Sequence, residues 1–202
     1  MILALLAVAF YFGGNGPGFR GWNTDKNPAA ETTETDQYQT GPIPEGQPDP
    51  VEPENAVRTG EKSRCTISIT CASILDEKHI DWFDKQKIEL LPEDGWILPE
   101  TEVTFSGGDS AFDVLLQTCI DKDIHIDYVD TPIYNSAYIR GIGNIYQFDC
   151  GASSGWMYSV NDWFPIYGMS RYAVKDGDVI SVIYTCEMGE DVGGGSAIQT
   201  GQ

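Results

Sequence analysis

The sequence predicts an α+β fold in which one main helix crosses a mixed β-sheet. Residues 111–122 repeat apolar side chains at helical spacing, whereas several other segments alternate apolar and polar residues as half-buried strands do. Residues 23–62 are mostly Thr, Glu, Asp, Gln, Gly and Pro, a composition that cannot bury enough apolar surface to fold. The folded domain is therefore expected to begin at about residue 63.

The first expected strand covers residues 64–71, RCTISITC. Its odd-numbered residues form an apolar face, and the hydroxyl residues between them form a polar one. Cys65 and Cys71 would lie about 20 Å apart along this strand, too far for a mutual disulfide. Residues 73–91 are expected to be a polar helix or loop insertion, and residues 92–99 a turn.

The most regular element is the helix expected over residues 111–122. Ser110 or Asp109 can cap its first turn, and Asp113 is favourable at a helix N-terminus. The apolar residues follow the i, i+4, i+8 stripe of a helix lying on a sheet. They are Ala111, Phe112, Leu115, Leu116, Cys119 and Ile120.

The remaining segments predict strands before and after this helix. They cover residues 102–105, 124–129, 137–142, 144–148, 156–160 and 178–186. The last strand has apolar residues on both faces, which is typical of a central strand. The order suits a β-grasp-like mixed sheet, in which the first and last strands are parallel neighbours at the centre.

The chain has five cysteines and no C-x-x-C pair, so a zinc ribbon is disfavoured and no metal site is predicted. In the β-grasp arrangement Cys71 and Cys186, both at strand ends, come within reach of each other and are the candidate disulfide. An odd count leaves at least one cysteine unpaired. Cys119, on the apolar face of the helix, is expected to be a buried free thiol.

The N-terminal region predicts export. Ile2 to Phe12 is an apolar run of eleven residues, whereas a membrane-spanning helix needs about 20. The run fits the core of a signal peptide or the end of a longer segment, with a short buried element as the alternative. The chain therefore divides into an export or anchor segment (1–22), a disordered acidic stalk (23–62), a folded domain (63–189) and a flexible Gly-rich tail (190–202). An extracellular or cell-surface location is expected, with membrane contact only through the N-terminal segment.

The net charge of −19 argues against nucleic acid and anionic membrane surfaces as partners. Solubility accounts for such a charge, and cation binding is the alternative explanation.

Catalytic patterns are incomplete. Residues 151–155 match G-x-S-x-G, but that elbow needs a strand before its serine and a helix after it, and here a strand follows Ser153. His79 and His125 both precede this serine, against the hydrolase order. Asp121-x-Asp123-x-x-x-Asp127 lacks the glycine and glutamate of a calcium loop. No catalytic residue, metal site or required cofactor is predicted, and the protein is expected not to be an enzyme.

Residues 155–186 contain a dense group of aromatic side chains. The candidate ligand-binding set is Trp156, Tyr158, Asn161, Trp163 and Phe164. Trp156 and Tyr158 share one face of a strand, so core packing is the alternative for them. Trp163 and Phe164 follow a turn, where rigid aromatic residues serve either as a lid on the core or as a contact surface.

Several motifs resemble the transcobalamin-like C-terminal domain family of exported and surface proteins of Firmicutes. They are YNSAYI at 134–139, GIGN at 141–144, FDCG at 148–151, SGWMYSVN at 154–161, WFP at 163–165 and DGDVI at 176–180. The resemblance covers about Cys65 to Gly193. Family members often carry cysteine where this chain has Met169.

This resemblance implies a β-grasp-like fold. In transcobalamin and intrinsic factor the related domain covers cobalamin held against a separate helical barrel. It therefore implies a non-catalytic, exported or surface binding module, with cobalamin, another corrinoid or another small planar molecule as ligand. The alternative is an adhesion or interaction domain, whose aromatic residues contact a surface protein or glycan.

Overall fold

The computed structural model describes residues 41–197. The predicted export segment 1–22, residues 23–40 of the predicted stalk and residues 198–202 of the predicted tail lie outside the described residues. The strands are β1 (Lys62–Thr70), β2 (Trp96–Ser106), β3 (Ile126–Thr131), β4 (Ser136–Ile142), β5 (Ile145–Tyr146), β6 (Gly155–Val160) and β7 (Val179–Thr185), and the α-helix is α1 (Ala111–Asp121). Short 3-10 helices are η1 (Pro53–Asn55), η2 (Ala72–Leu75), η3 (Ile88–Leu90), η4 (Pro132–Tyr134), η5 (Met169–Arg171), η6 (Glu190–Val192) and η7 (Gly195–Ala197).

The principal sheet has the order β2-β1-β7-β6. Strands β1 and β7 are parallel, with a register that runs from Thr66 opposite Val179 to Thr70 opposite Ile183. The other two pairs in this sheet are antiparallel. The predicted mixed sheet is therefore confirmed, with its first and last strands as central parallel neighbours. The central position of β7 explains why its sequence is apolar on both faces.

Helix α1 begins at a capping box. The Ser110 hydroxyl accepts a hydrogen bond from the Asp113 backbone N–H (3.1 Å), and the Asp113 carboxylate accepts one from the Ser110 backbone N–H (2.9 Å). Both bonds satisfy backbone donors that a helix start otherwise leaves unpaired. The predicted apolar stripe of α1 packs into the main core together with β1 and β7 side chains, except for Ile120, which is 64% exposed; Val114 is buried in the core as well. The predicted helix and its crossing of the sheet are confirmed.

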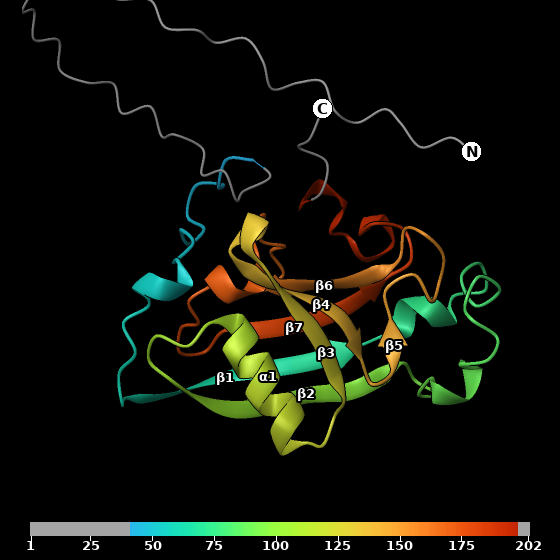
Figure 1. Ribbon diagram of the computed structural model, residues 1–202, viewed down its shortest axis with the longest axis horizontal. Helices are drawn as coiled ribbons and strands as arrows, with labels where there is room; N and C mark the ends of the chain where they lie inside the picture. Colours follow the sequence, from blue (N-terminus) through green and yellow to red (C-terminus); the bar gives the residue numbers. More distant parts are fainter. Residues whose placement is uncertain (1–40, 198–202) are drawn as a thin grey trace, which may run out of the picture. The chain divides into compact units, whose positions relative to one another are not determined.

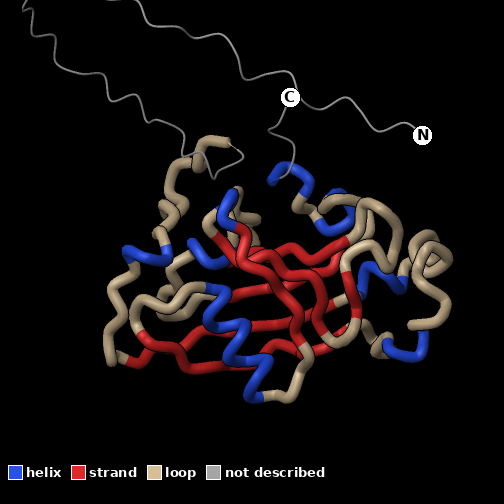
Figure 2. The backbone as a smooth tube through the Cα atoms, viewed as in Figure 1, coloured by secondary structure: helices blue, strands red, loops and turns tan. Residues whose placement is uncertain are grey.

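A second sheet of three strands, in the order β3-β4-β5, packs beside this helix. Figure 1 shows α1 and the β3–β4 hairpin in front of the four-stranded sheet. Figure 2 shows the same hairpin as two neighbouring strands that run across that sheet. Phe112 of α1 contacts Tyr128 of β3 edge to ring, with centroids 4.8 Å apart. The helix thus supports the inner face of the hairpin.

Strand β2 differs from its prediction. It begins at Trp96 rather than at residue 102, so the expected turn over residues 92–99 is shorter than predicted. Pro99 lies inside the strand. Because β2 is an edge strand, Pro99 need not donate a ladder hydrogen bond there. The predicted insertion, residues 73–91, forms the 3-10 helices η2 and η3 joined by turns.

The described part of the predicted stalk packs on the domain. Arg171 of η5 is 0% exposed, and its guanidinium binds the carboxylate of Glu52. The Val51 backbone N–H donates to the Arg171 carbonyl (2.8 Å), and the Tyr167 hydroxyl donates to the Pro48 carbonyl (2.8 Å). A buried guanidinium requires a counter-charge, and Glu52 supplies it from outside the predicted domain.

None of the helices in residues 41–197 combines the length and the apolar character that a membrane span requires.

Candidate functional site

Of the predicted contact residues, Trp156 and Tyr158 serve the core. The Trp156 indole N–H donates to the Ile145 carbonyl (3.0 Å), and its ring meets Tyr184 edge to face at 5.2 Å. The Tyr158 hydroxyl donates to the Tyr167 carbonyl (2.9 Å), and burial raises the pKa of this phenol well above its usual value. Both rings are half-buried and packed against the main core.

Asn161 and Trp163 belong to a tight turn after β6. Asn161 and Asp162 both have positive φ (51° and 64°), as the central residues of a type I′ hairpin turn do. The Val160 backbone N–H donates to the Trp163 carbonyl (2.8 Å). The Asn161 amide donates to the Asp178 carboxylate (2.9 Å) and accepts from the Val179 N–H (2.9 Å). The polar side chain of Asn161 is therefore used to join this turn to β7.

Phe164 is covered by the chain that follows β7. A Cβ added to Gly194 would lie 2.7 Å from the Phe164 ring and 2.8 Å from the Met157 methyl group, so only glycine fits between them. Trp163 packs against Tyr167, with ring centroids 5.9 Å apart. None of the five predicted contact residues lines the four cavities described for residues 41–197.

One group of exposed apolar and aromatic side chains lies on the β3–β4 hairpin. We call it the hairpin face and define it as Val129 (44% exposed), Ile133 (70%), Tyr134 (54%) and Tyr138 (45%). Val129 and Tyr138 are directly paired across the two strands, and η4 carries the other two residues. Burial and the nearby Tyr134 hydroxyl raise the pKa of Tyr138.

Polar groups border the hairpin face. The Tyr138 hydroxyl bonds the Gln147 side-chain amide oxygen, which holds the ring in place. Arg140 forms an ion pair with Asp127 further along the same two strands. The surface thus combines exposed apolar area with polar groups at its border.

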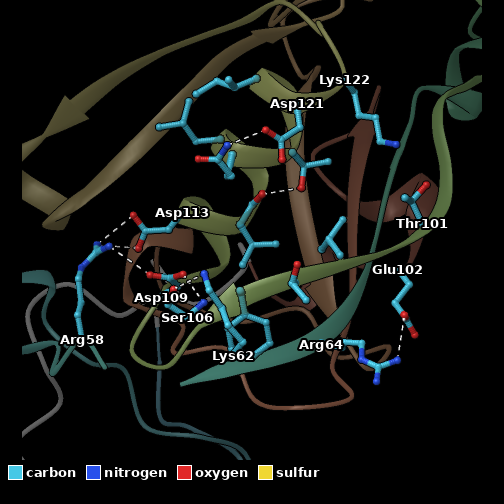
Figure 3. A pocket seen from close by; sticks show the side chains of 18 residues that line it. Arg58, Lys62, Arg64, Thr101, Glu102, Ser106, Asp109, Asp113, Asp121 and Lys122 are labelled. Carbon is cyan, nitrogen blue, oxygen red and sulfur yellow. Dashed lines mark hydrogen bonds and ion pairs between the residues drawn. The ribbon is translucent and has the colours of Figure 1, made fainter. Parts of the chain in front are cut away.

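A polar groove lies between α1 and β2 (Figure 3), with a volume of about 680 Å³. Arg58 pairs with Asp109 and Asp113 (3.2 and 3.0 Å), and Arg64 pairs with Glu102 (3.3 Å). Each of these guanidinium groups is matched by a carboxylate within the groove. The arrangement resembles a solvated surface ion-pair network more than an anion site.

The positions of the cysteines contradict the predicted disulfide between Cys71 and Cys186. All five are buried free thiols, which includes the predicted Cys119. Cys186 lies beside Cys150, with the two Sγ atoms 2.9 Å apart, and not in a bridge with Cys71. The β1–β7 register explains the difference: Thr70 is opposite Ile183, so Cys71 aligns with Tyr184, two residues before Cys186. Burial raises the pKa of both the Cys150 and the Cys186 thiol.

Residues 108–185 match DUF4430, a domain family of unknown function. The match confirms the resemblance to a transcobalamin-like family that the motifs predict. The matched residues contain α1, the hairpin face and Cys150, whereas His79 and Cys186 lie outside them.

No curated protein sequence matches the chain. Among solved structures, haptocorrin in complex with Cbi is similar at 14% identity and a TM-score of 0.46, covering 65% of this chain. The chain spans 27% of the length of that haptocorrin structure. A Ruminococcus gnavus protein, described as a candidate metal-binding protein, is similar at 12% identity and a TM-score of 0.39, covering 61% of this chain and 96% of its own.

Proposed function

We propose that this protein is a non-catalytic binding module that holds a small planar ligand against the hairpin face. The observation that carries the proposal is the exposure of four large apolar side chains side by side on one hairpin: Val129, Ile133, Tyr134 and Tyr138. Such residues normally turn inward unless another molecule covers them.

The hairpin face suits a flat ligand. Tyrosine rings offer broad rigid area at low cost in conformational entropy. The Tyr138 ring is held through Gln147, and Phe112 supports the opposite side of the hairpin through Tyr128. A ligand lying on this surface would gain roughly 25 cal/mol for each Å² of apolar area removed from water. The Arg140–Asp127 pair would offer hydrogen bonds at the ligand's edge.

A corrinoid is the ligand class to be tested first. The transcobalamin-like sequence resemblance supports this choice, and a corrin ring presents the flat apolar area that tyrosine rings stack on. One face of the ligand would remain in water, so we expect micromolar rather than picomolar affinity. No cofactor is required for this function, and bound corrinoid would be cargo.

The test is a titration of the full chain with cyanocobalamin and with cobinamide, followed by tryptophan fluorescence and the corrin absorption spectrum. Saturable binding is expected in the wild type and at least a tenfold loss in Tyr138→Ala. The matched control is Ile88→Ala, an exposed apolar residue away from the hairpin, which should bind as the wild type does. Absence of any saturable change up to about 100 µM, equivalent to about 5.5 kcal/mol, would reject a corrinoid ligand.

A second measurement compares the two aromatic regions. The double substitution Trp163→Ala and Phe164→Ala removes two predicted contact residues. If it abolishes binding while the cooperative unfolding transition is unchanged, the contact surface lies on that turn and the hairpin proposal is wrong. If binding instead requires a protein or glycan partner and no small ligand is held, the adhesion alternative replaces this function.

The same proposal places the domain outside the cell, close to its surface. The apolar run at residues 2–12 and the acidic stalk that follows support export. Fusion of residues 1–62 to a reporter enzyme that is active only after export tests this location. Activity equal to that of a reporter without a leader would contradict it.

A further inference from the structure

Three side chains from separate parts of the chain meet beyond the end of β7. Cys186 follows β7, Asp191 belongs to η6, and His79 comes from the turns between η2 and η3. One donor atom from each of them lies within 4.8 Å of the other two. His79 and Cys186 are buried, and Asp191 is half-buried. The donor set is therefore a thiol, an imidazole nitrogen and a carboxylate oxygen.

Cys150 supplies a fourth donor. Its Sγ lies 2.9 Å from the Cys186 Sγ, and its thiol donates to the His79 carbonyl (3.4 Å). Cys150 comes from the loop between β5 and β6, so three distant segments contribute: the turns with His79, the loop with Cys150, and the chain after β7 with Cys186 and Asp191. The group now holds two sulfurs, one nitrogen and one oxygen.

This donor set matches the chemistry of zinc. Zn²⁺ prefers four ligands in a tetrahedron, at about 2.3 Å for sulfur and about 2.0–2.2 Å for nitrogen and oxygen. Those bond lengths place neighbouring donors roughly 3.3–3.8 Å apart. The upper bound of 4.8 Å among the His79, Cys186 and Asp191 donors lies above this range. The 2.9 Å between the two sulfurs lies below it. Shifts on the order of 1 Å per pair would bring the His79, Cys186 and Asp191 donors, and the two sulfurs, to these spacings.

Neighbouring groups already orient the donors. The His79 Nδ1 donates to the Ser73 carbonyl (2.7 Å), which leaves Nε2 as the nitrogen that can carry a lone pair. The Asp191 carboxylate accepts from the Cys186 backbone N–H (2.8 Å) and from the Thr185 hydroxyl. Glu187 contacts His79 Nε2 (3.0 Å) and would have to yield to a bound ion.

The group is accessible through a cavity of about 510 Å³. Cys150 and Cys186 both line it, together with Trp82, Ser153, Glu187 and Glu190. Glu187 is also paired with Lys78, and the net charge of −19 favours cations near the protein.

We propose that His79, Cys150, Cys186 and Asp191 form a four-coordinate site for a thiophilic divalent cation of the zinc class. Binding requires both thiols to be reduced, since the metal coordinates thiolates. The site is separate from the hairpin face, so it stands whether or not the proposed function does.

The test uses the full chain, reduced with a phosphine and kept without oxygen, and titrated with Co²⁺ as the spectroscopic substitute for Zn²⁺. A 1:1 end point with a thiolate-to-cobalt charge-transfer band and the visible spectrum of a tetrahedral ion is expected. Excess Zn²⁺ should displace the cobalt. No charge-transfer band in the reduced protein would overturn the proposal.

Variants locate the site. Cys186→Ser should lower the affinity at least a hundredfold, and Asp191→Asn at least tenfold. The matched control is Cys119→Ser, a buried thiol in α1 outside the group, which should bind as the wild type does. Equal affinity in Cys186→Ser and the wild type would refute the assignment.

A second readout covers the case in which a variant does not fold. The ¹¹³Cd NMR shift of the cadmium-loaded wild type reports the number of sulfur ligands directly. A shift typical of two thiolates agrees with the proposal, and a shift typical of oxygen ligands alone excludes it.

Discussion

The aromatic residues of this protein occupy two regions that resemble each other in sequence and differ in use. The segment 155–172 is dense in aromatic side chains, yet its rings pack inward, and its polar atoms bond to the backbone and to neighbouring side chains. The β3–β4 hairpin has fewer aromatic residues, yet Tyr134 and Tyr138 lie in the open.

Whether an aromatic residue on a strand belongs to the core or to the surface therefore depends on the elements that pack over that strand, rather than on the composition of the strand. Strand β6 carries Trp156 and Tyr158 in the principal sheet, and both rings pack against the core. In contrast, the described residues place α1 against only one face of the hairpin, through Phe112 and Tyr128. Its other face keeps Tyr138 and Val129 exposed. Four substitutions examine this contrast, from the largest expected effect to the smallest.

Trp156→Ala should destabilise the protein most, by about 3 kcal/mol, because it removes a large ring from the junction of the two core clusters. Urea unfolding followed by far-UV circular dichroism measures the change. A loss below about 1 kcal/mol would mean that Trp156 is a surface residue, and the division between the two regions would fail.

Glu52→Gln should cost about 2–3 kcal/mol. It removes the carboxylate charge that pairs with the buried Arg171 guanidinium, and the cost is less than for a pair with no solvent contact because Glu52 is partly exposed. Glu54→Gln is the matched control on the same segment, since Glu54 is exposed and its carboxylate accepts a hydrogen bond from the Asn135 amide at 3.2 Å. The control should change unfolding by less than about 0.5 kcal/mol. Equal losses of stability in Glu52→Gln and Glu54→Gln would show that residues 41–61 do not stabilise the aromatic segment 155–172.

Asp113→Asn should cost about 1 kcal/mol at pH 7, since it removes the charged half of the capping box below the hairpin. Burial raises the pKa of Asp113, but hydrogen bonds from Ser110 and Arg58 and the Arg58 charge outweigh it, so the pKa lies below its usual value. Because the pKa of Asp113 is lower in the folded state, its carboxylate stabilises the folded protein at pH values above the unfolded pKa of about 4. This stabilisation is lost as the pH falls through the pKa of the folded state.

The difference between wild type and Asp113→Asn should therefore shrink below about pH 4. Ser110→Ala should show the same trend with a smaller amplitude, because the Ser110 hydroxyl donates to the Asp113 carboxylate and helps to lower its pKa, while the cost of losing the bond to the Asp113 N–H persists at low pH. A pH-independent difference for Asp113→Asn would contradict the assigned direction of the pKa shift.

Tyr138→Ala should have the smallest effect on stability, within about 0.5 kcal/mol, because its ring is largely exposed. Tyr138→Phe keeps the ring and removes only the bond to Gln147, which separates stacking area from hydroxyl contacts in a binding assay. Destabilisation of 2 kcal/mol or more in Tyr138→Ala would place the hairpin residue in the core.

Local signals were sufficient for most of the fold. Alternation located β1 and β6, the capping residues Ser110 and Asp113 located the start of α1, and two apolar faces identified β7 as central. The early start of β2 was missed because Pro99 signals a turn, and only the edge position of the strand makes it acceptable.

The candidate sites were less predictable because they depend on tertiary contacts. The group of His79, Cys150, Cys186 and Asp191 has no characteristic spacing, since three distant segments bring its members together. Val129 and Tyr138 lie in segments that alternate as strands do, and this alternation was the one local signal, which predicts a strand. It does not show which face of the hairpin α1 leaves uncovered.

The parallel pairing of β1 with β7 has a consequence for folding. Thr66 pairs with Val179, so the centre of the sheet joins residues from nearly opposite ends of the domain. Contacts of such long sequence separation slow folding, because the loop must close before the contacts stabilise it. The sheet cannot be completed until residue 185 has been synthesised, so β1 lacks its central neighbour for nearly the whole of synthesis.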